Sequence, residues 1–545
     1  MNLKTISAPT WEILHRLHGG SGFWHRVLTG SADRVTTLLE LGACGEPAVL
    51  LEIADYLFAP EGEVRRAARN AVDQLLSQVP CGRLAEVDYR VRVVGSHRPY
   101  GETAWWQMKP DQVERLANGE HAVSILGLAS FHANGHVREA ALRKLSEDTS
   151  GLELPFLLIR LNDWVEPVRT LAHEGVQSRL TANYAGHFLK SLHLLLRLEF
   201  CGREAHDATV QAVGELLCRP ECRPQLLEGV ASGDRVMRHA CLRFAAEIEG
   251  AGRLSILRAA LGDTDPLIRL WTARRLLADA TMDDLPKLTA ELVRDPFMPV
   301  RREALQSLAQ RLPDLAAPVL LEALTDRHAS IRETARFYLG LLGRPDAVSI
   351  YRERLNGAVG AQLVGAVLGL GETGTSEDVE RIRPLLKSDE TRYRKAAIIA
   401  LARIAPEALI EEFTAALADP MPGVSNEGCT ALLQRVHSVE PAALFTLLRE
   451  DTPEHVKKNA LKLTMRLGKW VSLPVLISLS RGESIISSRT RAFLESWLLS
   501  PRRDYSRPTE QQMVAAARAL AEASPGLDAG LERSLSSLLK EWGAP

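Results

Sequence analysis

The chain has 545 residues, of which 46% are hydrophobic and 25% charged, an ordinary balance for a folded protein. Its formal net charge of −2 gives no overall attraction to nucleic acid. No apolar run reaches the ~20 residues that cross a bilayer, because Arg, Asp or Glu interrupts every Leu-rich stretch. Residues 1–7 also lack the apolar core of a secretory signal. We therefore expect a cytoplasmic protein that does not act at a membrane.

The N-terminal part of the chain predicts a cap followed by a helical repeat. Residues 1–44 contain Trp11 and Trp24, which we expect to shield the open end of a stack of helices. Residues 45–85 form the first repeat, and its second helix opens near Arg65 in the sequence Gly-Glu-Val-Arg-Arg-Ala-Ala-Arg. The repeat array is thus expected to begin directly after the cap.

Residues 86–109 interrupt the helical pattern. Val87, Tyr89, Val91 and Val93 alternate with polar residues, and a period of two is typical of a β-strand. The following segment, 95–101, contains Gly and Pro in a turn-forming order, which allows residues 103–108 to return as a partner strand. The sequence therefore predicts a small β-hairpin insertion.

The predicted hairpin carries two adjacent tryptophans, Trp105 and Trp106. Neighbouring residues of a strand face opposite sides, so one ring can pack on the repeats while the other stays open to a partner. In the alternative, both rings cover the core of the insertion itself. Both residues are candidates for partner binding.

Residues 110–500 repeat with a fixed period. Positions at intervals of 30 to 32 residues open the same kind of helix, namely Arg238, Arg269, Arg301, Arg332, Gln362, Arg394, Ser425, Lys457 and Arg489. Such a period predicts a stack of helix–turn–helix units in which neighbours bury each other's apolar faces. Two closing helices are expected in residues 501–545, at 511–523 and 531–542.

An aspartate recurs six residues before the basic residue that opens the second helix of a unit. Asp295 and Arg301 show this spacing, and so do Asp163 with Arg169, Asp263 with Arg269, and Asp326 with Arg332. A short carboxylate is able to accept N–H bonds in the turn and to face the guanidinium of an adjacent unit. We expect these residues to fix the register between repeats, a structural role.

These patterns resemble the HEAT-repeat family, in particular the short variant of about 30 residues found in phycobilisome-lyase-type proteins. The Asp-x5-Arg spacing and the Val-Arg-x-x-Ala helix opening carry the resemblance, from about Gly45 to Leu499. It implies an all-α superhelical solenoid whose second helices line a concave face, and the short repeat points to a bacterial source. Relatives include scaffolds, lyase partners and nucleic-acid binders, so the resemblance implies no particular chemistry.

The segment 455–507 has an uneven charge, with eleven basic side chains against three acidic ones, a net charge of +8. Lys458, Lys462 and Arg466 are spaced four residues apart and fall on one face of a predicted helix. A positive stripe attracts phosphates or an acidic protein, whereas the alternative is a solvated face paired with neighbouring acids. The candidate partner-binding residues are Lys458, Lys462, Arg466, Lys469, Arg489 and Arg491.

Motifs of catalysis or cofactor binding are missing from the sequence. Gly369–Gly374 fits G-x-G-x-x-G, but it lies between two predicted helices, and we interpret its glycines as helix-ending and turn residues. The seven cysteines are odd in number and lack paired ligand spacing, which favours reduced thiols. We therefore expect no enzyme activity, no cofactor and no metal.

The sequence is most typical of a non-enzymatic scaffold or adaptor for protein–protein interactions within a multi-component assembly. The first alternative is a nucleic-acid-binding solenoid that uses the basic C-terminal groove. The second is a lyase-like or chaperone-like partner of a cofactor-carrying protein. Neither the partner nor the oligomeric state follows from the residues.

Overall fold

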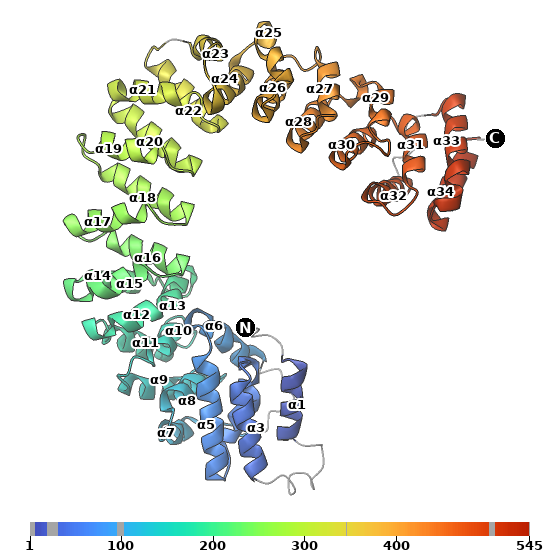
Figure 1. The fold of residues 1–545 in the computed structure, drawn as a ribbon. Helices are drawn as coiled ribbons and strands as arrows, with labels where there is room; N and C mark the ends of the chain where they lie inside the picture. Colours follow the sequence, from blue (N-terminus) through green and yellow to red (C-terminus); the bar gives the residue numbers. More distant parts are fainter. Residues whose placement is uncertain (1–5, 19–30, 95–102, 345, 501–506, 544–545) are drawn as a thin grey trace. The chain divides into compact units, whose positions relative to one another are not determined.

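The computed structural model describes residues 6–18, 31–94, 103–344, 346–500 and 507–543, and every regular element in these ranges is a helix (Figure 1). The chain divides into two compact units, Met1–Leu276 and Leu277–Pro545. The all-α prediction is therefore confirmed for the described ranges. None of the helices in them is long and apolar enough to cross a membrane.

The helices of unit 1 are mostly short and antiparallel to their neighbours in the chain. They are α1 (Ala8–His18), α3 (Ser31–Ala43), α4 (Leu50–Ile53), α5 (Gly62–Ser77), α6 (Leu84–Tyr89), α7 (Pro110–Ala117), α8 (Ala122–Ala129), α9 (Gly135–Glu147), α10 (Leu154–Arg160), α11 (Glu166–Gln177), α12 (Ala185–Lys190), α13 (Leu192–Arg197), α14 (Asp207–Cys218), α15 (Arg223–Val230), α16 (Arg235–Ala245) and α17 (Ala251–Ala260). Helix α18 (Pro266–Asp279) runs across the boundary between the units.

Unit 2 continues the same alternation with greater regularity. Its helices are α19 (Leu285–Leu292), α20 (Met298–Arg311), α21 (Pro313–Ala323), α22 (Ala329–Leu341), α23 (Ala347–Leu355), α24 (Gly360–Thr373), α25 (Val379–Ile382), α26 (Thr391–Ile404), α27 (Ile410–Leu417), α28 (Pro422–Leu432), α29 (Pro441–Thr446), α30 (Glu454–Thr464), α31 (Lys469–Leu479), α32 (Ile485–Leu498), α33 (Glu510–Ala523) and α34 (Ala529–Glu541). The last two occupy the segments where closing helices are expected.

The second helix of each pair, the B helix, recurs with a fixed spacing. In unit 2 the B helices α20, α22, α24, α26, α28, α30 and α32 begin at residues 298, 329, 360, 391, 422, 454 and 485. They lie along one side of the unit, and the first helices of the pairs lie along the other side (Figure 1). The predicted repeat of 30 to 32 residues is thus confirmed in this unit.

The apolar stripe of each B helix supplies the core. In α20, Val300, Ala304 and Leu308 are buried, together with Leu285 and Leu288 of the preceding α19. Removing each such side chain from water contributes roughly 1.5–3 kcal/mol for a residue of Val or Leu size. Neither helix of a pair is able to bury its stripe alone, so stability depends on neighbouring units.

The Arg and Asp residues that recur with the repeat connect successive units as predicted. Four arginines donate from Nε and Nη2 to both oxygens of an aspartate 25 residues later, at 2.8–3.1 Å: Arg138 to Asp163, Arg238 to Asp263, Arg301 to Asp326, and Arg394 to Asp419. Their Nη1 atoms donate to the turn carbonyl six residues earlier. Bidentate, charge-assisted bonds of this kind set a geometry as well as an attraction. We call this series the ladder.

Each ladder aspartate also organises its own turn. Its Oδ1 accepts the backbone N–H two residues on, at 2.7–3.0 Å, from Val165, Asp265, His328 and Met421. Other hydrogen bonds replace the arginine contacts where the repeat has no arginine at the ladder position. Ser425 Oγ donates to the Leu417 carbonyl at 2.7 Å, and Lys457 Nζ donates to the Glu450 carbonyl at 2.9 Å.

The prediction of a β-hairpin at 86–109 is wrong. Residues 84–89 form α6, Arg90–Val94 continue as a π-helical turn, and residues 103–107 form a turn, while 95–102 lie outside the described residues. The apolar alternation also satisfies a helix, because Val87 and Val91 are four residues apart and both are buried. Asp88 and Arg92, at the same spacing, form an ion pair of 2.5 Å.

The interpretation of the G-x-G-x-x-G segment needs a correction as well. Gly369 and Gly371 lie inside α24, and only Gly374 stands at the C-terminal cap. A Cβ on Gly371 would meet Ala400 Cα of α26 at 2.4 Å, and one on Gly369 would meet the Tyr351 ring at 2.3 Å. These two glycines therefore allow close packing between helices, which is not the geometry of a phosphate-binding loop.

Candidate partner-binding surface

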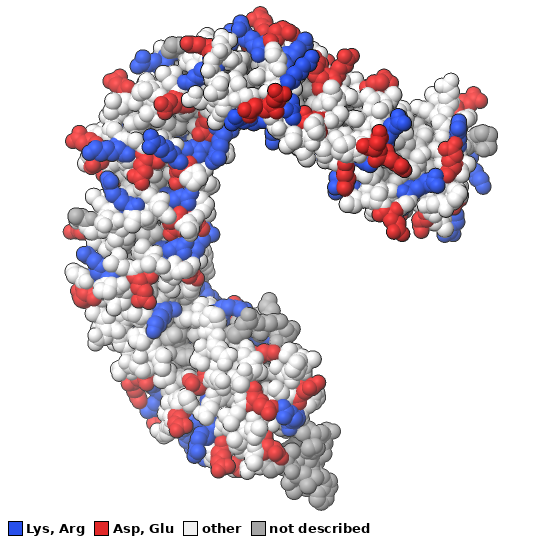
Figure 2. Space-filling model, in the orientation of Figure 1, with Lys and Arg blue, Asp and Glu red and all other residues white. Residues whose placement is uncertain are grey.

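The exposed sides of the B helices form a continuous face of unit 2, which we call the B face. In α22 the residues one, five and nine positions after the ladder residue, Glu333, Phe337 and Leu341, are exposed and contribute to this face. At the same positions after Lys457 stand Lys458 and Lys462 in α30 and Arg466 in the turn that follows it. Figure 2 shows acidic and basic side chains side by side over unit 2, so no single sign of charge covers it. The local groupings along the B face are therefore the informative feature.

Lys458 and Lys462 lie one turn apart in α30, as the spacing predicts, whereas Arg466 follows the end of that helix at Thr464. We call Lys458, Lys462 and Arg466 the basic row. Lys458 is paired with Glu454 one turn earlier, at 2.6 Å. Lys462 and Arg466 are exposed and form no ion pair with any part of the chain that the structure describes. Two positive charges of the row are thus left for solvent or a partner.

The row lies beside the preceding B helix, α28. Burial raises the pKa of the Cys429 thiol in α28, and the positive charges of Lys462 and Arg466 act in the opposite direction. These charges are therefore close to α28 rather than remote from it. The basic row thus spans the surface between two neighbouring B helices.

The other predicted basic residues do not join the row. Lys469 opens α31, where its ammonium lies 5.6 Å from the centre of the Trp497 ring. Arg491 Nη1 donates to the carbonyls of Ser480 and Gly482, at 2.8 and 2.6 Å, and so holds the turn before α32. Arg489 is exposed on α32. Binding roles for these three residues remain predictions.

A hollow of about 740 Å³ opens beside the first turn of α30, and no sequence pattern predicted it. Its walls carry both signs of charge, including Glu450, Glu454, Lys457, Arg481 and Glu483. A smaller, mostly apolar hollow of about 250 Å³ shares Leu448, Ser478 and Leu479 with it. Mixed charge beside apolar side chains suits a peptide surface better than a small anion.

The two tryptophans of the irregular segment in unit 1 are held by the core. Trp105 is 1% exposed, its backbone N–H donates to Asp55 Oδ1 at 2.8 Å, and its backbone carbonyl lies 3.0 Å from His132 Nε2. Trp106 is half-buried, with its ring centre 5.6 Å from that of His132. Trp105 therefore presents no surface to a partner, whereas a partner contact through Trp106 remains a prediction.

A buried charge network attaches this irregular segment to the ladder. Arg160 pairs with Asp88 of α6 and, at 2.8 Å, with the ladder residue Asp163. Burial acts to raise the pKa of Asp163, but the hydrogen bonds and charges of Arg138 and Arg160 outweigh it and the pKa is lowered. This network links α6, α9 and α10 through buried charges.

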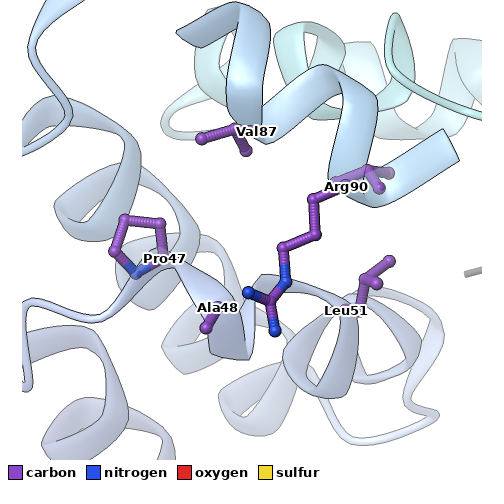
Figure 3. Close-up of a pocket in the computed structure, with 6 residues that line it drawn as sticks. Pro47, Ala48, Leu51, Val87 and Arg90 are labelled. Atoms are coloured by element: carbon purple, nitrogen blue, oxygen red, sulfur yellow. The ribbon is translucent and has the colours of Figure 1, made fainter. Parts of the chain in front are cut away.

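Two further features bear on ligand binding in the part of the chain that the structure describes. The gap lined by Pro47, Ala48, Leu51, Val87 and Arg90 holds about 10 Å³, room for one water at most (Figure 3). In the described ranges, no three His, Cys, Asp or Glu side chains gather in a way that could hold a metal ion. All seven cysteines are free thiols.

The geometry defines an α-helical repeat array with an extended B face. Residues 285–362, from α19 into α24, match the family model of HEAT repeats, so this stretch of unit 2 is similar to HEAT repeats. The narrower resemblance to the phycobilisome-lyase type remains a prediction. No curated protein sequence matches the chain.

Solved structures with similar folds are distant. Kap121p bound to RanGTP is 12% identical with a TM-score of 0.37, and the match covers 91% of this chain and 56% of that one. Importin beta is 13% identical with a TM-score of 0.32, over 99% and 88% of the two chains. Escherichia coli YibA is 14% identical with a TM-score of 0.25, over 58% and 98%. At these TM-scores the likenesses give no ground for transferring a partner.

Proposed function

We propose that this chain is a non-enzymatic scaffold that binds an acidic protein partner through the basic row of α30. The observation that carries the proposal is the exposure of Lys462 near the end of α30 and of Arg466 in the turn after it, with no carboxylate partner among the described residues. Exposed charges of one sign raise the rate of association with an oppositely charged surface and favour it over other partners. The adjoining hollows would add contact area for the same partner.

A protein partner fits this surface better than single-stranded nucleic acid does. Binding of single strands gains from exposed aromatic rings that stack on the bases between the basic residues. The two nearby tryptophans, Trp470 and Trp497, are buried and pack edge-to-face at 6.5 Å. A cytoplasmic location, a bacterial source and membership of a larger assembly remain predictions that accompany this proposal.

The test is affinity purification with the full chain from its native host extract, with and without nuclease, and identification of retained proteins. We compare the wild type with Lys458→Glu/Lys462→Glu/Arg466→Glu. The matched control is Arg16→Glu/Arg143→Glu/Arg235→Glu, which reverses three charges at exposed sites on α1, α9 and α16 of unit 1.

We expect a defined set of proteins that survives nuclease, is lost from the basic-row variant and is kept by the control. Loss after nuclease would instead assign the row to nucleic acid. If both variants retained the same proteins as the wild type, the basic row would have no role in partner binding.

A further inference from the structure

Helix α22 presents two large apolar side chains to solvent. Phe337 is 59% exposed and Leu341 is 68% exposed, and the two residues stand one helical turn apart on the B face. The Phe337 ring packs edge-on against Tyr338, at 5.1 Å between ring centres. Isolated apolar side chains at a surface are common, but an exposed aromatic ring beside a second apolar residue is a candidate binding anchor.

A cluster of arginines adjoins this apolar pair. The ladder residue Arg332 has Gly357 where the other steps have an aspartate, and it pairs instead with Glu372 of α24. Arg336 donates to the same carboxylate at 2.8 Å, and Arg403 of α26 donates to it at 3.3 Å. One carboxylate of α24 thus faces three guanidinium groups, two from α22 and one from α26.

The cluster has more positive than negative side chains, and its most solvent-exposed member is an arginine. The side chain of Arg332 is 3% exposed, that of Arg336 20%, and that of Arg403 49%. The hydrogen bonds of the arginines hold the pKa of Glu372 low against the effect of its burial, so this carboxylate stays charged. In Figure 2 basic side chains gather along the B-helix edge near α22–α26, beside an acidic patch. Arg403 is long, half-exposed and held weakly enough to meet a second carboxylate.

We propose that α22, α24 and α26 bind an acidic amphipathic segment of a partner protein. Apolar side chains of that segment cover Phe337 and Leu341, and its carboxylates meet Arg403 and Arg336. The proposal rests on the scaffold function above but uses a different part of the B face. Charge complementarity favours an acidic segment, because planar guanidinium groups that already bind the carboxylate of Glu372 are able to bind further carboxylates. Leu341 favours a peptide over a nucleic acid, because a phosphate backbone would leave its apolar surface uncovered.

The experiment selects phage-displayed random linear peptides on the immobilised full-length protein. The affinity of a synthetic copy of the most enriched peptide is then measured by fluorescence anisotropy. We expect enriched peptides that combine Asp or Glu with two apolar residues three or four positions apart. Phe337→Ser, Leu341→Ser and Arg403→Glu should each weaken binding roughly tenfold or more, while Arg403→Lys keeps part of the affinity.

The control variant is Phe200→Ser, which removes an even more exposed ring from unit 1 and should leave the affinity unchanged. The basic-row variant of α30 should also bind the peptide normally, so failure of this site and failure of the basic row are separate results. Peptides without acidic residues, or binding that is indifferent to Phe337→Ser and Arg403→Glu, would overturn the proposal. So would tight binding of oligo(dT), or a solution dimer that Phe337→Ser converts to monomer, because each assigns the surface to another occupant.

Discussion

Arg138 and Asp163 lie 25 residues apart and meet through two hydrogen bonds of 2.9 and 2.8 Å, with both side chains almost completely buried. The equivalent two hydrogen bonds form in three further ladder steps, but the arginines and aspartates of those steps are partly exposed to water. Burial therefore distinguishes one step of a repeated contact from the others. We therefore expect arginine variants at different ladder steps to lose different amounts of folding stability.

Arg138→Ala is expected to be more destabilising than Arg394→Ala. Removing Arg138 leaves a buried carboxylate short of a partner and should cost roughly 3–5 kcal/mol, whereas the more accessible Arg394 should cost about 1–3 kcal/mol. Arg138→Lys keeps the charge but loses the planar fork, so it should fall between wild type and Arg138→Ala. Calorimetric unfolding measures the series, and equal losses for Arg138→Ala and Arg394→Ala would contradict the role given to burial.

The repeat and the ladder were predictable because they are local and periodic. Where the Asp-x5-Arg spacing occurs, it places the carboxylate in the turn and the guanidinium at the helix opening, so one physical argument applies many times. The common side of Lys458 and Lys462 was predictable for the same reason, since a spacing of four residues places side chains on one helix face, but the end of the helix before Arg466 was not. Whether Lys462 and Arg466 have acidic partners depends on neighbouring units, and the spacing says nothing about that.

The irregular segment and the arginine cluster depend on contacts between distant residues. Val87 and Val91 satisfy a strand by alternation and a helix by their four-residue separation, and the buried contact of Asp88 with Arg160 favours the helix. Glu372 stands 40 residues from Arg332 and outside the Asp-x5-Arg spacing. Exposed anchors such as Phe337 have no sequence signal either, because an aromatic residue in a repeat helix is usually core.

The buried His132 is expected to make stability depend on pH. Burial lowers its pKa from 6.5 to about 4, so between these values the unfolded chain binds a proton that the folded chain does not. The contribution is therefore fully present above about pH 6.5 and is lost as the pH falls toward 4, a change of about 3 kcal/mol. Urea unfolding at a series of pH values should show this slope in the wild type and a reduced slope in His132→Gln. An unchanged slope in the variant would mean that other groups cause the dependence.

Two glycines of unit 2 form a matched pair for testing helix packing. A Cβ on Gly371 would lie 2.4 Å from Ala400 Cα, so Gly371→Ala should force α24 away from α26 and destabilise by roughly 1–3 kcal/mol. Gly340 in α22 has nothing within 4 Å of an added Cβ, so Gly340→Ala should stabilise by about 0.5–1 kcal/mol through helix propensity. Thermal unfolding of the two variants should therefore shift in opposite directions. If both variants changed the unfolding temperature in the same direction, the loss of glycine's backbone freedom, rather than the close approach of α24 and α26, would determine their stability.

The Glu372 cluster should lose stability in the order in which its members are buried. Glu372→Gln leaves the buried Arg332 without a counter-charge and should cost the most, roughly 3 kcal/mol. Arg336→Gln should cost less, and Arg403→Gln under about 1 kcal/mol, because its contact is half-exposed and screened by solvent. Hydrogen exchange of α22, α24 and α26 measures the local losses, and salt should change only that of Arg403→Gln. If Arg403→Gln proved as harmful as Glu372→Gln, the outer arginine would be needed for the fold and would not be available to a partner.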